Sequence, residues 1–236
     1  MLRFMALVLV LFALTPAVSA EPAAPNYARA VYLDGAITGR GIDPVTNALQ
    51  AYASKSKEPV DMIINSPGGE VLAGLWIIDT MKDLQSRGIT IRCFVKRYAA
   101  SMAFQIYLHC NERYALEGSI LLWHRVRSHM QDYIAEPSGL ASLLQDLLAV
   151  DAEMSRDAEG LLPLDAETIS FHAEHETRHH AHGLAKLTGG NGKWMTVERA
   201  FPGLLTVPTT VPRLVAPMEM KVRAYKILYQ TDLEGE

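Results

Sequence analysis

The residues best suited to chemistry lie between positions 61 and 124, at the ends of three apolar runs. Ser101 stands between a run typical of a strand and one with helical period, and His124 follows a later strand-like run. A serine hydroxyl is a weak nucleophile until a neighbouring base takes its proton, and histidine is the most frequent such base. Alone, Ser101 would be explained as a helix N-cap and His124 as a core histidine. Together they indicate acyl transfer.

The turn Pro67-Gly68-Gly69 supplies a third part of this arrangement. Its glycines permit positive φ and close backbone approach, and it precedes a run of helical period whose first N–H groups lack intrahelical partners. Such N–H groups can stabilise the oxyanion of a tetrahedral intermediate, and the N–H of Met102, directly after Ser101, would be a second donor. In isolation the same sequence would be a tight turn without a ligand.

These segments together resemble the proteolytic subunit of the Clp protease, within the Clp/crotonase superfamily. The similarity is close over residues 61–125 and weaker from about 29 to 185. It rests on Asn65-Ser66-Pro67-Gly68-Gly69, Asp79-Thr80-Met81, Ala99-Ala100-Ser101-Met102 and His124. The resemblance implies a crotonase-type α/β fold with repeated β-β-α units and a helical C-terminal part. It also implies a serine endopeptidase with Ser101 as nucleophile, His124 as general base, and an oxyanion hole formed by the N–H groups of Gly69 and Met102.

The third member of the implied triad is not fixed by the sequence. In the family it is an Asp about a dozen residues before the Gly of a Tyr-Gly-Leu-like segment. Here His182-Gly183-Leu184 matches that segment, but the expected position falls near Phe171. The nearby carboxylates that remain as alternatives are Asp165, Glu167 and Glu174.

A competing motif occurs in the histidine-rich stretch 172–182. The run His175-Glu176-Thr177-Arg178-His179 satisfies H-E-x-x-H, which on a helix places two zinc ligands one turn apart with Glu as base. Because five of the eight histidines fall in this stretch, such a match arises easily. We therefore expect a solvated polar helix here, with no catalytic metal and no cofactor. A zinc hydrolase and a catalytically inactive Clp-like scaffold or binding protein remain alternatives.

The elements expected to position the site alternate in type. Apolar runs predict strands at 30–33, 60–65, 89–95, 113–116 and 120–123, and helical periods predict helices at 71–86 and 102–109. Asp43-Pro44 is typical of a helix start, with Asp43 as N-cap. A leucine-rich helix follows Ser138. This alternation indicates an α/β domain with a mainly parallel sheet.

The chain of 236 residues is expected to contain one main domain. Arg3, the apolar run 4–14 and Val18-Ser19-Ala20 are typical of a secretory signal peptide at 1–20. The Clp-like peptidase domain should occupy 21–188. Residues 189–236 should form an irregular extension with one short helix near 218–228. The predicted localisation is therefore periplasmic or secreted, where Cys93 and Cys110 would form either a disulfide or two buried thiols.

The net charge of −4 gives no reason to expect nucleic acid as a partner. The resemblance implies a peptide or protein substrate and a homo-oligomer of face-to-face rings, with residues 140–154 as a contact. It would also imply an ATPase partner, but an exported chain meets no ATP pool, which makes that partner doubtful. An acyl-CoA-handling crotonase relative is disfavoured for a similar reason, since CoA substrates are not expected outside the cytoplasm.

Overall fold

The structure is a computed structural model that describes residues 24–127 and 136–204. Its centre is a mostly parallel sheet of order β1-β2-β3-β4-β7, in which β5 pairs with β3 and β6 runs antiparallel to β5. The strands are β1 Ala30–Asp34, β2 Val60–Ser66, β3 Ile91–Ala100, β4 Glu112–Leu116, β5 Ile120–Leu122, β6 Arg178–His180 and β7 Thr196–Glu198. The helices are η1 Tyr27–Arg29, α1 Ile42–Lys55, α2 Val71–Ser86, α3 Met102–Leu108, α4 Pro137–Leu161, α5 Ala166–Glu174 and α6 Ala181–Leu187.

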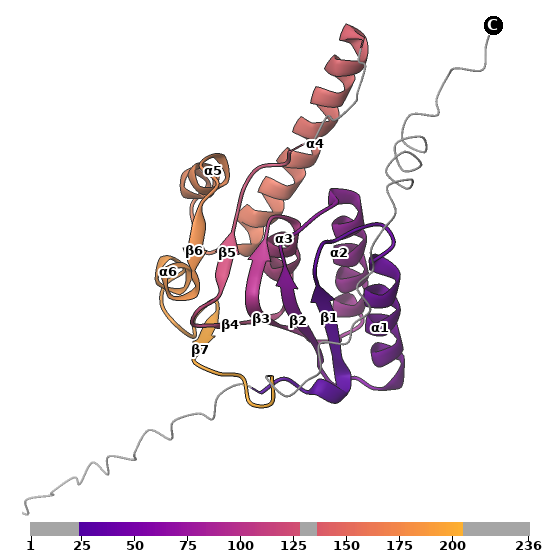
Figure 1. The fold of residues 1–236 in the computed structure, drawn as a ribbon, viewed down its shortest axis with the longest axis vertical. Coiled ribbons are helices and arrows are strands. Elements are labelled where there is room, and N and C mark those ends of the chain that lie inside the picture. Colours follow the sequence, from indigo (N-terminus) through magenta and orange to yellow (C-terminus); the bar gives the residue numbers. More distant parts are fainter. Residues whose placement is uncertain (1–23, 128–135, 205–236) are drawn as a thin grey trace, which may run out of the picture.

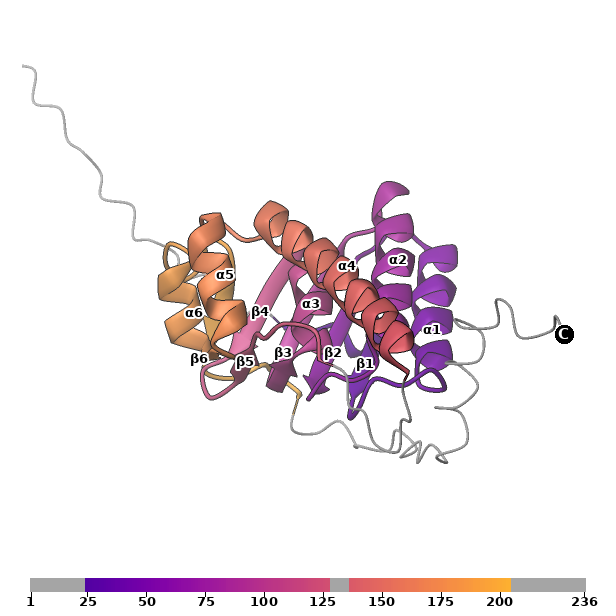
Figure 2. The ribbon, with the colours of Figure 1, turned by 90° about the horizontal axis from the view of Figure 1, so that it is seen from above.

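The helices cover the two faces of the sheet unequally. Helices α1, α2 and α3 lie on one face, while α5 and α6 stand beside the β5–β6 edge (Figures 1 and 2). Because side chains alternate along a strand, Met62 and Ile64 of β2 join the large core under the helices. Ile63 points to the opposite face and packs in a smaller cluster with Phe94 and Phe201. On that second face the cluster is completed by Phe201 and Leu204, which follow β7, and by Tyr27 of η1 rather than by an α-helix.

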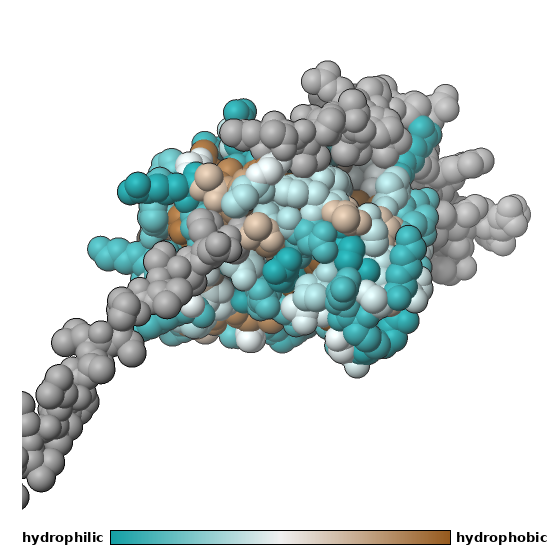
Figure 3. All heavy atoms as spheres, turned by 90° about the horizontal axis from the view of Figure 1, so that it is seen from below, coloured by the Kyte–Doolittle hydropathy of each residue, from teal (hydrophilic) through white to brown (hydrophobic). Residues whose placement is uncertain are grey.

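Helix α4 is the main projection from this body. It extends well beyond the sheet (Figure 1), and Met154 and Ala158 are its buried residues. Seen from below, the described surface is mainly hydrophilic, with apolar residues scattered among polar ones (Figure 3). Within the described residues, no helix combines the length and apolar character that a membrane crossing requires.

The expected α/β class with a mainly parallel sheet is confirmed, and the helix expected at 71–86 has those bounds. Helix α1 begins earlier than expected, because Gly41 is its N-cap and Asp43 lies in its first turn. Strand β3 continues to Ala100 instead of ending at 95. The region expected to be irregular contributes β7, which pairs with β4. The signal peptide and the helix expected near 218–228 lie outside the described residues.

Candidate active site

Parallel strands bring the three sequence motifs to one edge of the sheet. Strands β2, β3 and β5 all end there, with Ser66 opposite Ala99 and Ala100 opposite Leu122. The Gly68-Gly69 turn, the Ser101 junction and His124 follow these strand ends directly. The carboxyl ends of parallel strands are the usual place for a site in such a sheet.

Ser101 joins β3 to α3 in a backbone conformation that non-glycine residues rarely adopt. Its φ is 55° and its ψ is −125°, and its side chain makes no capping hydrogen bond to α3. The simple N-cap explanation of Ser101 therefore does not hold. Its N–H donates to the carbonyl of Leu122 at 2.9 Å, so the end of β5 holds the junction in place. A strained turn of this kind between strand and helix exposes a nucleophile in other hydrolase folds.

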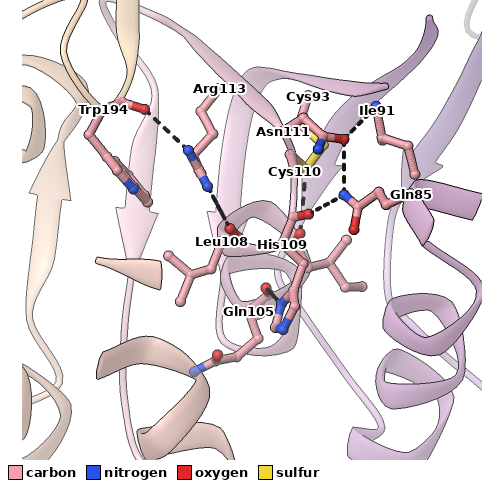
Figure 4. Close-up of a disulfide and its surroundings, with 11 residues drawn as sticks. Gln85, Ile91, Cys93, Gln105, Leu108, His109, Cys110, Asn111, Arg113 and Trp194 are labelled. Carbon is pink, nitrogen blue, oxygen red and sulfur yellow. Dashed lines mark hydrogen bonds between the residues drawn. A yellow bond between two sulfur atoms is a disulfide. The ribbon is translucent and has the colours of Figure 1, made fainter. Parts of the chain in front are cut away.

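A disulfide between Cys93 and Cys110 closes the chain around this junction (Figure 4). Cys93 lies in β3 and Cys110 follows α3, and both side chains are buried. Beside it, the Asn111 side chain accepts hydrogen bonds from the N–H of Ile91 and from the amide of Gln85. Of the two states expected for these cysteines, the structure contains the disulfide. The strand before Ser101 and the helix after it are thus covalently joined.

Gly68 lies directly against the Ser101 junction. A Cβ on Gly68 would stand 2.5 Å from the carbonyl oxygen of Ala100, 2.7 Å from Ser101 Cβ and 2.9 Å from the nitrogen of Met102. The φ of Gly68 is +89°, and its N–H donates to the Ser66 hydroxyl at 3.1 Å. Only glycine combines this backbone angle with this approach. The turn and the start of α3 are therefore in direct contact.

Gly69 is held by the segment before α1. Ile37 donates its N–H to the carbonyl of Gly68, and its own carbonyl accepts from Glu70, both at 2.9 Å. Within residues 24–127 and 136–204, the N–H of Gly69 itself makes no hydrogen bond. The N–H of Met102 opens α3 and also has no hydrogen-bond acceptor within the described part of the chain. Two unpaired backbone donors thus border the turn that carries Ser101.

His124 reaches the same edge, but its imidazole is bonded elsewhere. Its Nδ1 is 2.5 Å from the carbonyl oxygen of Arg125. Over residues 24–127 and 136–204, no hydrogen bond joins His124 to the Ser101 hydroxyl. The backbone on either side pairs with the end of α5 and the segment that follows it, because the N–H of Trp123 donates to the carbonyl of Thr177 and that of Arg125 to the carbonyl of Ala173.

The three carboxylates considered for the triad lie along α5. Asp165 is the N-cap of this helix and accepts from the N–H of Thr168 at 2.7 Å. Glu167 lies in the first turn. Glu174 is the last helical residue and binds Arg125 at 2.8 Å. The end of α5 and the residues after it face His124, whereas Asp165 and Glu167 lie at the start of this helix. Because an α-helix rises about 1.5 Å per residue, these two carboxylates are separated from His124 by most of the length of α5.

In the sequence, Glu176 belongs to the zinc motif and is not among the carboxylates expected for the triad. This residue follows α5 with a φ of 49°, and Arg127 donates to its Oε2 at 2.5 Å. The hydrogen bond from Arg127 is the largest cause of a lowered pKa at Glu176, and the charges of Arg127, His124 and Arg178 act in the same direction. Glu176 therefore interacts electrostatically with the proposed base.

One signal in the sequence could have found Glu176. Gly183, which was matched to the Gly of the family segment, lies inside α6. The helix gives way at Thr188 to Gly189, whose φ is +96°. Counting back about a dozen residues from Gly189 reaches the neighbourhood of Glu176.

The H-E-x-x-H run does not lie on a helix, so the helix expected there is wrong. Helix α5 ends at Glu174, and residues 178–180 form β6. The one-turn spacing that a zinc pair needs is therefore lost. The described residues contain no group of three or more His, Cys, Asp or Glu that could hold a metal ion. Burial, reinforced by the charge of His172, lowers the pKa of His179 to about 4.

Comparison with known proteins relates the chain to Clp proteases. The family model described as Clp protease matches residues 26–198. The ATP-dependent Clp protease proteolytic subunit of Carsonella ruddii is 40% identical over 75 residues, 32% of this chain and 37% of that relative. The subunit of the same name from Ligilactobacillus salivarius is 29% identical over 147 residues, 59% of this chain and 72% of that relative. The matched part thus spans little more than a third of the first relative.

Proposed function

The chain belongs to the Clp protease family, and we propose that it is a serine endopeptidase that cleaves peptide bonds through an acyl-enzyme on Ser101. The observation that carries this proposal is the contact between the strained Ser101 junction and the Gly68-Gly69 turn. A serine held at positive φ, beside two N–H donors that have no acceptor among the described residues, is arranged for attack on a carbonyl.

In the proposed reaction the imidazole of His124 turns from the Arg125 carbonyl toward Ser101 and takes the hydroxyl proton. The Oγ–C bond forms, and the carbonyl oxygen becomes an oxyanion stabilised by the N–H groups of Gly69 and Met102, at roughly 3 kcal/mol per donor. The imidazolium then gives its proton to the leaving amine as the C–N bond breaks. In the second half His124 deprotonates a water molecule that attacks the acyl carbonyl. The C–Oγ bond then breaks, Ser101 Oγ takes the proton back from His124, and the acyl group leaves as a carboxylic acid.

Glu176 is the carboxylate that we propose as the partner of the imidazolium. Its charge acts on His124, and the lowered pKa keeps it ionised at neutral pH. In a serine–histidine site this group fixes the tautomer of the base and stabilises its charged form. Asp165, Glu167 and Glu174 lack a comparable contact with His124 among the described residues.

We further propose that copies of the chain assemble through α4 and act on peptides or proteins. Leu140, Leu144 and Leu148 recur every fourth residue of this helix and are 43%, 57% and 56% exposed. A continuous apolar stripe on a projecting helix is typical of a contact with another chain. The relatives are named as ATP-dependent. We propose that this chain acts outside the cytoplasm, where it would have no ATPase partner. The buried disulfide supports this location, because disulfides persist in oxidising compartments.

A fluorophosphonate probe tests the proposed reaction. The wild-type protein should be labelled covalently at Ser101, Ser101→Ala should not be labelled, and His124→Ala should react at a rate lower by several orders of magnitude. The same variants should lose hydrolysis of a denatured protein substrate. A folded wild-type protein that takes up no label would refute the proposal and favour the catalytically inactive scaffold.

A further inference from the structure

The carboxylate of Glu176 stands among three cationic or titratable side chains. Arg127 donates to Oε2 at 2.5 Å, and the guanidinium of Arg178 lies 3.9 Å from Oε1. His124 is the third, acting through its charge. The two arginines thus lie near different oxygens of the Glu176 carboxylate, and of the two only Arg127 donates a hydrogen bond to it.

Backbone pairing keeps Glu176 opposite His124. The N–H of Trp123 donates to the carbonyl of Thr177, and the N–H of Arg125 donates to that of Ala173. His124 is the residue between these two donors, and 174–176 is the stretch between the two acceptors. Glu176 takes a positive φ in that stretch, so its backbone is fixed in an unusual conformation.

The side chain of Glu176 is less constrained than its backbone. It has three rotatable bonds and is 36% exposed, so without a partner it would sample several directions. Nearby, Arg125 is already bound to Glu174 at 2.8 Å and lies 3.6 Å from Asp151, so it does not compete for Glu176. Arg127, two residues after Arg125, is the side chain that restrains the Glu176 carboxylate.

We propose that Arg127 is a positioning residue, which holds Oε2 of Glu176 so that Oε1 can accept the Nδ1–H of His124 during catalysis. This inference rests on the proposed function of Ser101 and His124. It assigns to Arg127 no contact with the substrate. Its effect passes through Glu176 to the orientation and charge of the base.

Labelling kinetics in the full chain test this role, with Arg178→Ala as the matched control. Both substitutions remove one positive charge near Glu176, but only Arg127→Ala removes a hydrogen bond to it. We expect Arg127→Ala to slow fluorophosphonate labelling by about two- to fivefold, because a partly exposed ion pair contributes a free energy that corresponds to a rate change of this size. Arg178→Ala should be labelled at a rate near that of the wild type. Arg127→Lys should recover part of the rate.

A pH profile separates positioning from a general loss of structure. The hydrogen bond from Arg127 lowers the pKa of Glu176, so its removal should let Glu176 take up a proton at higher pH. In the pH range where carboxyl groups titrate, the acid limb of the labelling profile should therefore move to higher pH in Arg127→Ala, and by less in Arg178→Ala, whose charge is a smaller cause of the lowered pKa. Because Arg127 is 53% exposed, the melting temperature should change little.

The outcomes distinguish this inference from the function on which it depends. A labelled wild type with Arg127→Ala as fast as Arg178→Ala, or faster than wild type, would overturn the role of Arg127 alone. An unmoved acid limb would do the same. An unlabelled wild type would overturn the proposed function and this inference together.

Discussion

Gly68→Ala is the substitution that most directly tests how the site is built. The added Cβ would lie 2.5 Å and 2.9 Å from backbone atoms of Ala100 and Met102, which cannot rotate out of the way. The turn and the Ser101 junction must therefore move apart. The N–H groups of Gly69 and Met102 would then no longer point at the same oxyanion. Losing one oxyanion donor costs about 100- to 1,000-fold in rate. We expect a loss of labelling and of peptide hydrolysis of that size.

Gly88→Ala is the matched control for the backbone part of this change. Gly88 has a φ of +81°, close to the +89° of Gly68, but a Cβ there would meet nothing within 4 Å. A side chain at such an angle costs about 1 to 2 kcal/mol. For a chain of this length that corresponds to a melting temperature lower by about 2 to 8 °C. Gly88→Ala should show this thermal shift with wild-type labelling rates.

The assay pairs thermal unfolding, followed by circular dichroism, with the rate of fluorophosphonate labelling below the transition. Gly68→Ala should lose at least as much stability as Gly88→Ala and, unlike it, should lose the reaction. If folded Gly68→Ala labels Ser101 as fast as Gly88→Ala, the contact between turn and junction has no part in catalysis. The N–H groups of Gly69 and Met102 would then not act together as an oxyanion hole.

Three further predictions concern stability and assembly. Replacing Cys93 and Cys110 with Ser opens a loop of 17 residues, which should lower the free energy of unfolding in urea by about 3 kcal/mol. Leu144→Glu should shift the protein to smaller species in analytical ultracentrifugation, because it places a charge on the exposed stripe of α4. Burial lowers the pKa of His179 from 6.5 to about 4. In that interval the folded protein binds fewer protons than the unfolded chain, so stability should fall as pH drops from 6.5 to 4, and His179→Leu should flatten this slope.

Each of these has an outcome that contradicts it. Wild-type protein unfolded in strong reductant should approach the stability of the Cys93/Cys110 variant, and a persistent gap would mean that the serines themselves disturb the core. Gln145→Glu adds the same charge beside the stripe of α4, so equal dissociation by both variants would exclude a specific leucine contact. A pH slope that survives in His179→Leu would assign the acid sensitivity to another group.

The parts of the fold that could be predicted from sequence are those with a local signature. Helix α2 has a turn with glycines before it, helical period within it, and Gly88 after it, and its bounds were predicted correctly. The start of α1 was misjudged because Pro44 is tolerated anywhere in a first turn, so it did not identify the N-cap. Strand β7 is three residues long and is held by pairing with β4, a long-range contact with little local signal.

The same distinction explains the candidate site. Ser101, His124 and the glycine turn each follow an apolar run, so their convergence follows from the rule that parallel strands end at one edge. Glu176 follows a helix in a histidine-rich stretch, and its positive φ is not signalled by glycine or asparagine. Its proximity to His124 depends on the pairing of residues 123–125 with 173–177, which only the tertiary structure defines.

The strain at Ser101 bears on the choice between an enzyme and an inactive scaffold. A non-glycine residue at positive φ typically costs of order 1 kcal/mol or more and persists only where its surroundings over-determine it. Here three independent constraints do so: the bond to Leu122, the packing of Gly68, and the disulfide between Cys93 and Cys110. A binding protein would gain stability from glycine at this position, whereas a nucleophile needs both the hydroxyl and the turn that exposes it. The conformation is thus costly for a scaffold and useful for a hydrolase.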